Sequence, residues 1–260
     1  MRKPVRKVFK YFAFTLLALV LLFAASFLPV LNLNTGNMST LQGEWITVYY
    51  EAEEKAARDV FDLADKKAGQ LQEMLGFSEK QNINLYIYDD QTRFQTKKYG
   101  LIAPLLGLDW YIGDNRGSTV LLASPGGVTN NAAYDRRCQA ALHEMVHAYN
   151  SLLNPKMPLW LNEGTALYLT NGDPMKDLYS RSPMPTMQEM KTSSPIDFSN
   201  MGGYDFAHTY IEYLDKTYGW DKVLSLLRGD SCLTALGKDE TAIYQEWTAF
   251  LQTHYATARF

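Results

Sequence analysis

The residues best suited to chemistry gather between positions 143 and 163. His143, Glu144 and His147 form the pattern His-Glu-x-x-His, and Glu163 follows after fifteen intervening residues. Residues four apart on a helix lie on one face, so both imidazoles can reach one metal ion. Glu163 supplies a third ligand, and a fourth position left for water is typical of a catalytic zinc ion. Glu144 is placed to take a proton from that water. The sequence therefore predicts one zinc ion per chain.

Both parts of this motif lie in segments with the spacing of a helix. Around the histidines, apolar residues recur at helical intervals: Ala141, Leu142, Met145, Val146 and Tyr149. The second segment has Pro158 where a first helical turn would begin and Asn171-Gly172 as a stop signal. The chain holds only four histidines, and two of them are here, which favours a metal site over a chance match.

His-Glu-x-x-His followed by Trp160-Leu161-Asn162-Glu163-Gly164-Thr165-Ala166 resembles the gluzincin zinc peptidases. The second stretch is close to that of the zinc aminopeptidases, whereas residues 45 to 257 as a whole are more similar to the compact peptidase MA-like domains of bacteria. The resemblance implies zinc on His143, His147 and Glu163, with Glu144 as general base. The Gly-x-Met-Glu-Asn segment that holds a substrate amino terminus in aminopeptidases is absent, and the spacer before the third ligand is shorter. Both departures favour an endopeptidase.

Two neighbouring zinc families are excluded by position. A metzincin requires Gly and His three and six residues after the second histidine, where this chain has Asn150 and Leu153. An intramembrane protease carries the motif within a long apolar helix. Here the motif helix also contains charged and polar residues, namely Asp135, Arg136, Arg137 and Gln139. The motif therefore belongs to a domain outside the membrane.

The amino-terminal segment has the character of a membrane anchor. Residues 1 to 10 carry five basic residues and no acid, and residues 11 to 31 are uncharged and almost wholly apolar, long enough to span a bilayer. The basic flank predicts a cytoplasmic amino terminus and an exported remainder. A signal peptide cleaved near Ala24-Ala25-Ser26, giving a secreted protein, is the alternative. Because the apolar run continues to Leu31, the sequence favours an uncleaved anchor (11–31), a linker (32–44) and one domain (45–260).

Charge and cysteine content limit the partners. Removing the five basic tail residues from the 25 in the chain leaves 20 against 28 acidic residues, a net charge of −8. An acidic domain argues against nucleic acid as a partner, so the expected partners are a peptide or protein substrate and the membrane.

The two cysteines, Cys138 and Cys232, either form a disulfide, as cysteines of exported domains often do, or remain two separate thiols. The sequence leaves this pairing and the oligomeric state open.

Periodicity predicts an α+β fold, with a small amino-terminal sheet followed by helices. Strands are expected around residues 46–50 and 83–87, and a hairpin from 110–112 and 119–123 around the turn-forming Gly113-Asp114-Asn115-Arg116-Gly117. Helices are expected at residues 52–75, 91–99, 134–152, 158–170, 203–218, 221–228 and 239–255. The order, with the ligands in the later helices, matches what the gluzincin resemblance implies.

Two further features follow from the resemblance and from the chemistry. Gluzincins pair extended substrate with the strand just before the zinc helix, which by position is residues 118 to 124. An amide hydrolase also needs a donor for the oxyanion, and Tyr204 and His208 are four apart at the start of a helix. Tyr204 is the first choice and His208 the second, with core packing as the alternative for either. Asn162 and Asp205 are candidates to orient the ligand imidazoles.

These features predict a membrane-anchored, extracytoplasmic zinc metallopeptidase that hydrolyses peptide bonds with Glu144 as general base. Two alternatives use the same sequence features. One is a non-catalytic peptide- or protein-binding domain on a peptidase scaffold, because fold and site do not guarantee a reaction. The other is a zinc amidase acting on cell-wall peptides. The segment 178–199, rich in Ser, Pro and Met, is expected to be a loop near the site.

Overall fold

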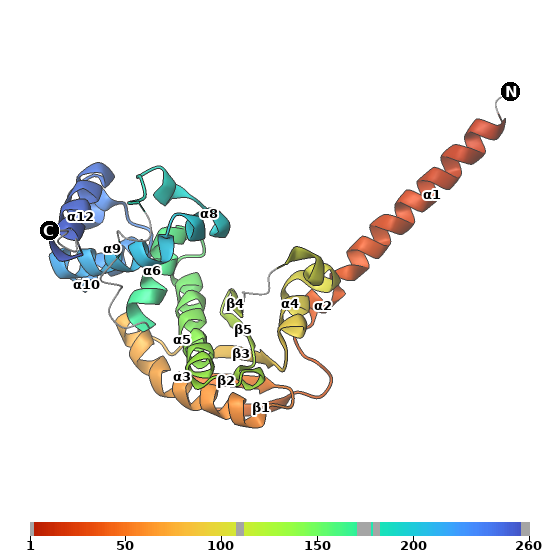
Figure 1. Cartoon of the computed structure of the whole chain (residues 1–260), viewed down its shortest axis with the longest axis horizontal. Helices are drawn as coiled ribbons and strands as arrows, with labels where there is room; N and C mark the ends of the chain where they lie inside the picture. Colours follow the sequence, from red (N-terminus) through yellow and green to blue (C-terminus); the bar gives the residue numbers. More distant parts are fainter. Residues whose placement is uncertain (1–2, 108–111, 171–177, 179–182, 256–260) are drawn as a thin grey trace.

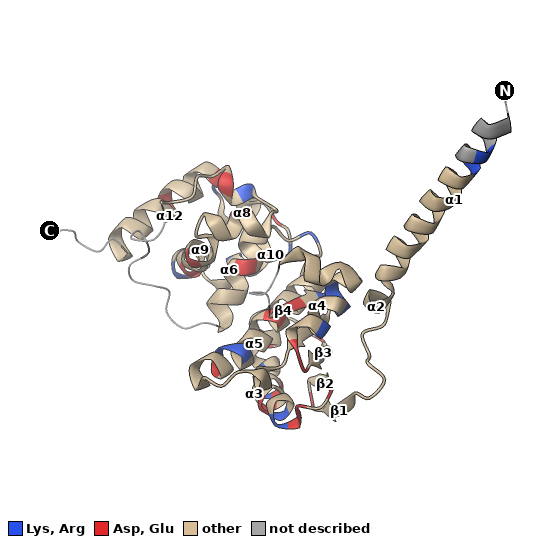
Figure 2. Cartoon of the chain, turned by 45° about the vertical axis from the view of Figure 1, so that its right-hand side comes forward, with Lys and Arg blue, Asp and Glu red and all other residues tan. Residues whose placement is uncertain are grey.

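The computed structural model describes residues 3–107, 112–170, 178 and 183–255. Helix α1 (Lys3–Ser26) stands away from the rest of the chain and is followed by the short α2 (Leu28–Leu31) (Figure 1). The stretch Phe9–Leu31 is long and apolar enough to cross a membrane. Its 23 residues span about 34 Å at ~1.5 Å per helical residue. The basic residues of this helix lie near its amino-terminal end in the sequence, and the coloured ones are seen there in Figure 2. Signal sequences share this length and composition.

A five-stranded mixed sheet lies at the base of the remaining chain, in the order β1-β2-β3-β5-β4. Its strands are β1 (Ser39–Gln42), β2 (Ile46–Tyr50), β3 (Ile83–Tyr88), β4 (Gly113–Arg116) and β5 (Thr119–Ala123). The three central strands run parallel, because α3 (Glu54–Met74) connects β2 to β3, and α4 (Gln91–Tyr99) and η1 (Gly100–Leu106) follow β3. The outer strands β1 and β4 run antiparallel to their neighbours.

Alternating side chains give this sheet two packed faces. Ile83, Leu85 and Ile87 of β3 lie in the main core with α3 and the long helix α5 (Asn131–Leu153). Tyr88 of β3 and Phe94 of α4 lie in a smaller cluster on the other face. The period-two alternation of β3 therefore places α3 and α5 on one face and α4 on the other.

Helices make up the chain after the sheet. They are α6 (Leu159–Thr170), α8 (Pro195–Asn200), α9 (Gly203–Tyr218), α10 (Trp220–Leu227), α11 (Cys232–Leu236) and α12 (Glu240–His254). Trp247 of α12 is fully buried, and its ring meets those of Trp160 in α6 and Tyr210 in α9. This aromatic contact joins the last helix to the helix that carries Glu163. The predicted α+β class is confirmed.

Three local expectations are corrected, and the question left open for the two cysteines is answered. Ser39–Gln42 pairs with β2, so the sheet begins inside the predicted linker. The expected turn residues Gly113–Arg116 form strand β4, and the hairpin turns at Gly117; residues 110 and 111 lie outside the described part. The strand before α5 in the chain, β5, is paired on both sides, so β4 rather than β5 is the edge strand at this end of the sheet, and β1 is the edge at the other end. Cys138 and Cys232 are separate thiols.

Candidate metal centre

Three ligand-type side chains meet where α5 crosses α6. His143 and His147 project from α5 and Glu163 from α6. The two Nε2 atoms lie 3.0 Å apart. Oε2 of Glu163 lies 3.4 Å from Nε2 of His143 and 3.5 Å from Nε2 of His147. These three groups could hold one metal ion.

The two distances from the Glu163 oxygen suit a tetrahedral zinc ion better than hydrogen bonds, whereas the 3.0 Å between the two Nε2 atoms is shorter than the tetrahedral spacing. Ligands at ~2.0–2.1 Å from a tetrahedral zinc ion are separated from one another by about 3.4 Å. A good N–H···O hydrogen bond is shorter, at ~2.7–3.2 Å. Among the described residues, the buried Oε2 of Glu163 has no hydrogen-bond partner. A buried carboxylate oxygen without a donor is costly, and a metal ion at this point would satisfy it.

The close approach of α6 to its neighbours sets the position of Glu163. A side-chain carbon at Gly164 would lie 2.5 Å from the carbonyl oxygen of Ala207, so α6 and α9 can meet at this distance only with glycine there. On the other side, Nδ2 of Asn150 in α5 donates to Oδ1 of Asn162 at 2.9 Å. The residues either side of Glu163 thus fasten α6 to both α9 and α5.

The three side chains line a cavity of about 480 Å³. Glu144 also lines the cavity, between the edge strand β4 and the three ligand-type residues His143, His147 and Glu163, called the metal group below. A side-chain carbon at Gly113 would lie 2.9 Å from Cγ of Glu144 and 3.1 Å from its Oε1. Glycine in β4 therefore leaves the space that the carboxylate of Glu144 occupies.

An ion pair stands on the same wall of the cavity. Nζ of Lys98, in the last turn of α4, lies 2.5 Å from Oδ2 of Asp114 in β4. Asp114 and its neighbour Asn115 both line the cavity. The side chain of Asn115 donates to Oγ of Ser151 in α5 at 3.0 Å. These contacts fix the edge strand to the helix that carries the histidines.

Burial and mutual charge shift the ionisation of the whole group. Burial raises the pKa of Glu144 to about 8 and lowers that of His143. Burial also opposes charge on His147, but attraction to the Glu163 carboxylate, Oε2 of which lies 3.5 Å from its Nε2, outweighs this effect and raises the pKa of His147 to about 9. Burial also raises the pKa of Glu163, but attraction to the two imidazoles outweighs burial and lowers it to about 2. These opposite shifts favour a charged carboxylate on Glu163 beside a charged imidazole on His147.

The two candidate oxyanion donors differ in where they lie. Tyr204, in the first turn of α9, lines the cavity, and burial raises its pKa to about 12, with the charges of Glu163 and Glu144 adding to the shift. His208 is buried, with its ring 5.7 Å from that of Tyr168. Among the described lining residues, the cavity includes Tyr204 but not His208, and Asn162 but not Asp205.

Several lining residues were not expected from the sequence. Tyr99 at the end of α4, and Gly113 and Asp114 on β4, come from segments far from the motif in sequence. Pro195 and Ile196 of α8 also line the cavity and come from the stretch expected to be a nearby loop. A turn-like composition was the only sequence signal at 113–117. It marked the position of these residues but not their proximity to the metal group.

Comparisons with known proteins find only distant likenesses. No protein-family model and no curated protein matches the chain. Among solved structures, native yeast LTA4 hydrolase aligns at a TM-score of 0.45 and 14% identity, over 84% of this chain and 37% of that one. Native leukotriene A4 hydrolase from Saccharomyces cerevisiae gives 0.44 and 12%, over 84% and 36%. The chain thus spans little more than a third of those enzymes. A likeness this distant carries neither an activity nor a substrate to this chain.

Proposed function

We propose that this chain is a membrane-anchored, extracytoplasmic zinc metallopeptidase of gluzincin type that cleaves peptide bonds. The observation that carries the proposal is the group formed by His143, His147 and Glu163, whose ligand atoms lie 3.0 to 3.5 Å from one another, near the spacing of about 3.4 Å in a tetrahedral zinc site. The Glu163 oxygen without a hydrogen-bond partner supports it further. A bound zinc ion would supply a Lewis acid at this point.

The remaining cavity residues supply proton transfer and hydrogen bonding. Glu144 accepts the proton of the water that attacks the peptide carbonyl and delivers it to the leaving nitrogen, as a general acid–base. Tyr204, on the opposite helix α9, donates a hydrogen bond to the carbonyl oxygen as negative charge develops there. Both side chains line the same cavity as the three ligands.

The edge strand favours extended peptide as the substrate. Strand β4 is paired with β5 on one side, and its residues Gly113 to Asn115 line the cavity. An extended peptide can add to such an edge through backbone hydrogen bonds. The one carboxylate on this strand, Asp114, is already paired with Lys98. A substrate amino terminus therefore finds no unneutralised acid on β4, which supports cleavage within a chain rather than at its end.

Membrane topology completes the proposal. The apolar stretch Phe9–Leu31 acts as an uncleaved anchor, and the five basic residues before it keep the amino terminus in the cytoplasm. The domain that carries the metal group is then exported.

The test is Glu144→Gln in the full chain, purified in detergent and assayed on fluorescently labelled casein. Glu79→Gln, an exposed acid away from the cavity, is the matched control. We expect Glu144→Gln to keep its zinc and lose about 10²- to 10⁴-fold in turnover, the range that a general acid–base contributes. Full activity in this variant would refute the role of Glu144. Peptide capture without cleavage by the native chain would instead show a binding domain.

A further inference from the structure

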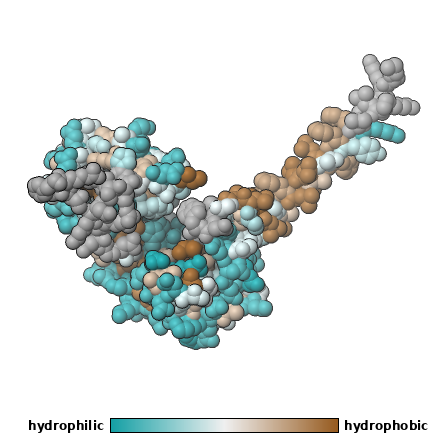
Figure 3. All heavy atoms as spheres, in the orientation of Figure 1, coloured by the Kyte–Doolittle hydropathy of each residue, from teal (hydrophilic) through white to brown (hydrophobic). Residues whose placement is uncertain are grey.

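The segment η1 exposes apolar side chains beside the membrane anchor. Leu101, Leu105 and Leu106 are all exposed, Leu105 to 85%, so three large apolar side chains gather within six residues of the surface. Grouped exposed apolar side chains mark a contact surface, whereas single exposed leucines are common. The segment contacts α1 and α2 where the anchor joins the domain (Figure 1). Figure 3 shows the hydrophobic surface of α1 continuing down to this junction.

Direct contacts tie this part of the domain to residues within the apolar span. A side-chain carbon at Gly100 would lie 2.5 Å from the carbonyl oxygen of Ser26, so the first residue of η1 lies directly against the anchor backbone. Gly100 also has φ 77°, a conformation that favours glycine. Nη1 of Arg116 in β4 donates to the carbonyl oxygen of Val30 at 2.6 Å.

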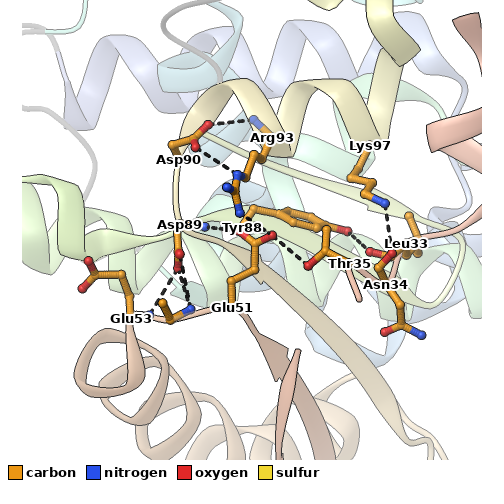
Figure 4. Close-up of polar contacts among 11 residues, drawn as sticks. Leu33, Asn34, Thr35, Glu51, Glu53, Tyr88, Asp89, Asp90, Arg93 and Lys97 are labelled. Carbon is orange, nitrogen blue, oxygen red and sulfur yellow. Dashed lines mark hydrogen bonds and ion pairs between the residues drawn. The ribbon is translucent and has the colours of Figure 1, made fainter. Parts of the chain in front are cut away.

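The chain after the span is also held on the domain (Figure 4). Nζ of Lys97 donates to the carbonyl oxygen of Asn34 at 3.1 Å, and also to that of Asn32 at 2.6 Å. The hydroxyl of Tyr88 donates to the carbonyl oxygen of Leu33 at 2.9 Å. Because successive residues of this segment are bonded to α4 and β3, the domain cannot swing away from the end of the anchor without breaking these bonds.

These contacts fix the depth of η1. About 20 helical residues cross the hydrocarbon core, so a core that begins after Lys10 ends near Val30. Ser26 lies four residues earlier, about 6 Å inside that edge at ~1.5 Å per residue. A segment in contact with Ser26 therefore lies at the boundary between headgroups and acyl chains, where exposed leucines are stable.

We propose that Leu101, Leu105 and Leu106 of η1 rest in the outer boundary layer of the membrane that α1 spans, and so hold the domain against the lipid surface. This inference rests on the proposed anchor. Tyr99, the residue before η1, lines the metal-site cavity. The cavity wall therefore lies next to the membrane contact.

Lipid quenching of a fluorophore tests this contact in the full chain. Single cysteines at Leu105, Leu19 of α1 and the exposed Leu233 of α11 are introduced in a Cys138→Ala, Cys232→Ser background. Each is labelled with nitrobenzoxadiazole, and the protein is reconstituted in phosphatidylcholine vesicles. A fraction of the lipid then carries a doxyl quencher near the headgroup end of the acyl chain or at mid-chain.

The expected pattern is specific to each position. The Leu105 label loses about half its emission to the shallow quencher, as a boundary residue should, the Leu19 label is quenched most at mid-chain, and the Leu233 label is unaffected. Quenching at Leu19 but not at Leu105 would overturn the inference and leave the anchor intact. No quenching at either position would overturn both. The emission of the Leu105 label could instead change with protein concentration and not with the quencher. That result would show a contact between copies of the chain and would also refute the inference.

Discussion

Gly113→Ala tests whether the edge strand positions Glu144. The added carbon would lie 2.9 Å from Cγ of Glu144 and 3.1 Å from a methyl carbon of Leu122. Non-bonded carbons pack at ~3.5–4.0 Å, so the Glu144 side chain must retreat by about 0.6–1 Å. A displacement of about 1 Å at a reacting group costs about 10²-fold in rate. We therefore expect kcat/KM to fall about 10²-fold.

The same substitution leaves His143, His147 and Glu163 untouched, so the zinc content should not change. The assay measures cleavage of labelled casein and zinc by mass spectrometry on the same full-length protein in detergent. Gly127→Ala is the matched control, because nothing lies within 4 Å of a side-chain carbon there. Activity equal to that of the control would refute the proposed packing of β4 on Glu144. Loss of zinc together with activity would show that Gly113 supports the metal group rather than the base.

Two further predictions concern the packing of α6 on α9 and a hydrogen-bonded carboxylate on α12. Gly164→Ala places a carbon 2.5 Å from the Ala207 carbonyl oxygen. Because this carbon forces α6 away from α9, we expect the free energy of unfolding to fall by about 1–3 kcal/mol. An unchanged urea midpoint and an unchanged zinc affinity would contradict this prediction. Hydrogen bonds from Lys238, Tyr218 and Tyr213 lower the pKa of Glu246 to about 2. Because the pKa of Glu246 is lower in the folded state than in the unfolded state (~4.5), its carboxylate stabilises the folded protein at pH values above about 4.5. This stabilisation is lost as the pH falls towards 2. In metal-free protein, Glu246→Gln should therefore lower the urea midpoint at neutral pH. The difference from the native chain should shrink as the pH falls below about 4.5 and vanish only near pH 2. A difference independent of pH would refute this.

Local sequence patterns predicted the elements that carry the ligands. The four-residue spacing of His143 and His147 and the apolar periodicity around them are properties of a single helix, and α5 and α6 appear where expected. The alternation in β3 is likewise local. These features require no knowledge of what packs against the segment.

The cavity wall opposite the ligands could not be predicted from local sequence patterns, because the positions of its residues depend on tertiary contacts. Gly113 and Asp114 are turn-forming residues, and they become strand β4 because they pair with β5 and pack on α5. Strand β1 is short and polar, with only Leu41 packed on the core, so its pairing with β2 outweighs its linker-like composition. The ion pair between Lys98 and Asp114 joins α4 to β4, a proximity that no local pattern contains.

The measurement that tests the central claim most directly is the zinc content of the full chain and of Glu163→Ala. Glu79→Ala serves as the control for loss of an exposed acid. We expect close to one zinc ion per native chain, the same in the control, and a large loss in Glu163→Ala, because two imidazoles alone bind zinc far more weakly than a three-ligand site. No zinc in the native protein after reconstitution, or full retention in Glu163→Ala, would contradict the three-ligand metal centre.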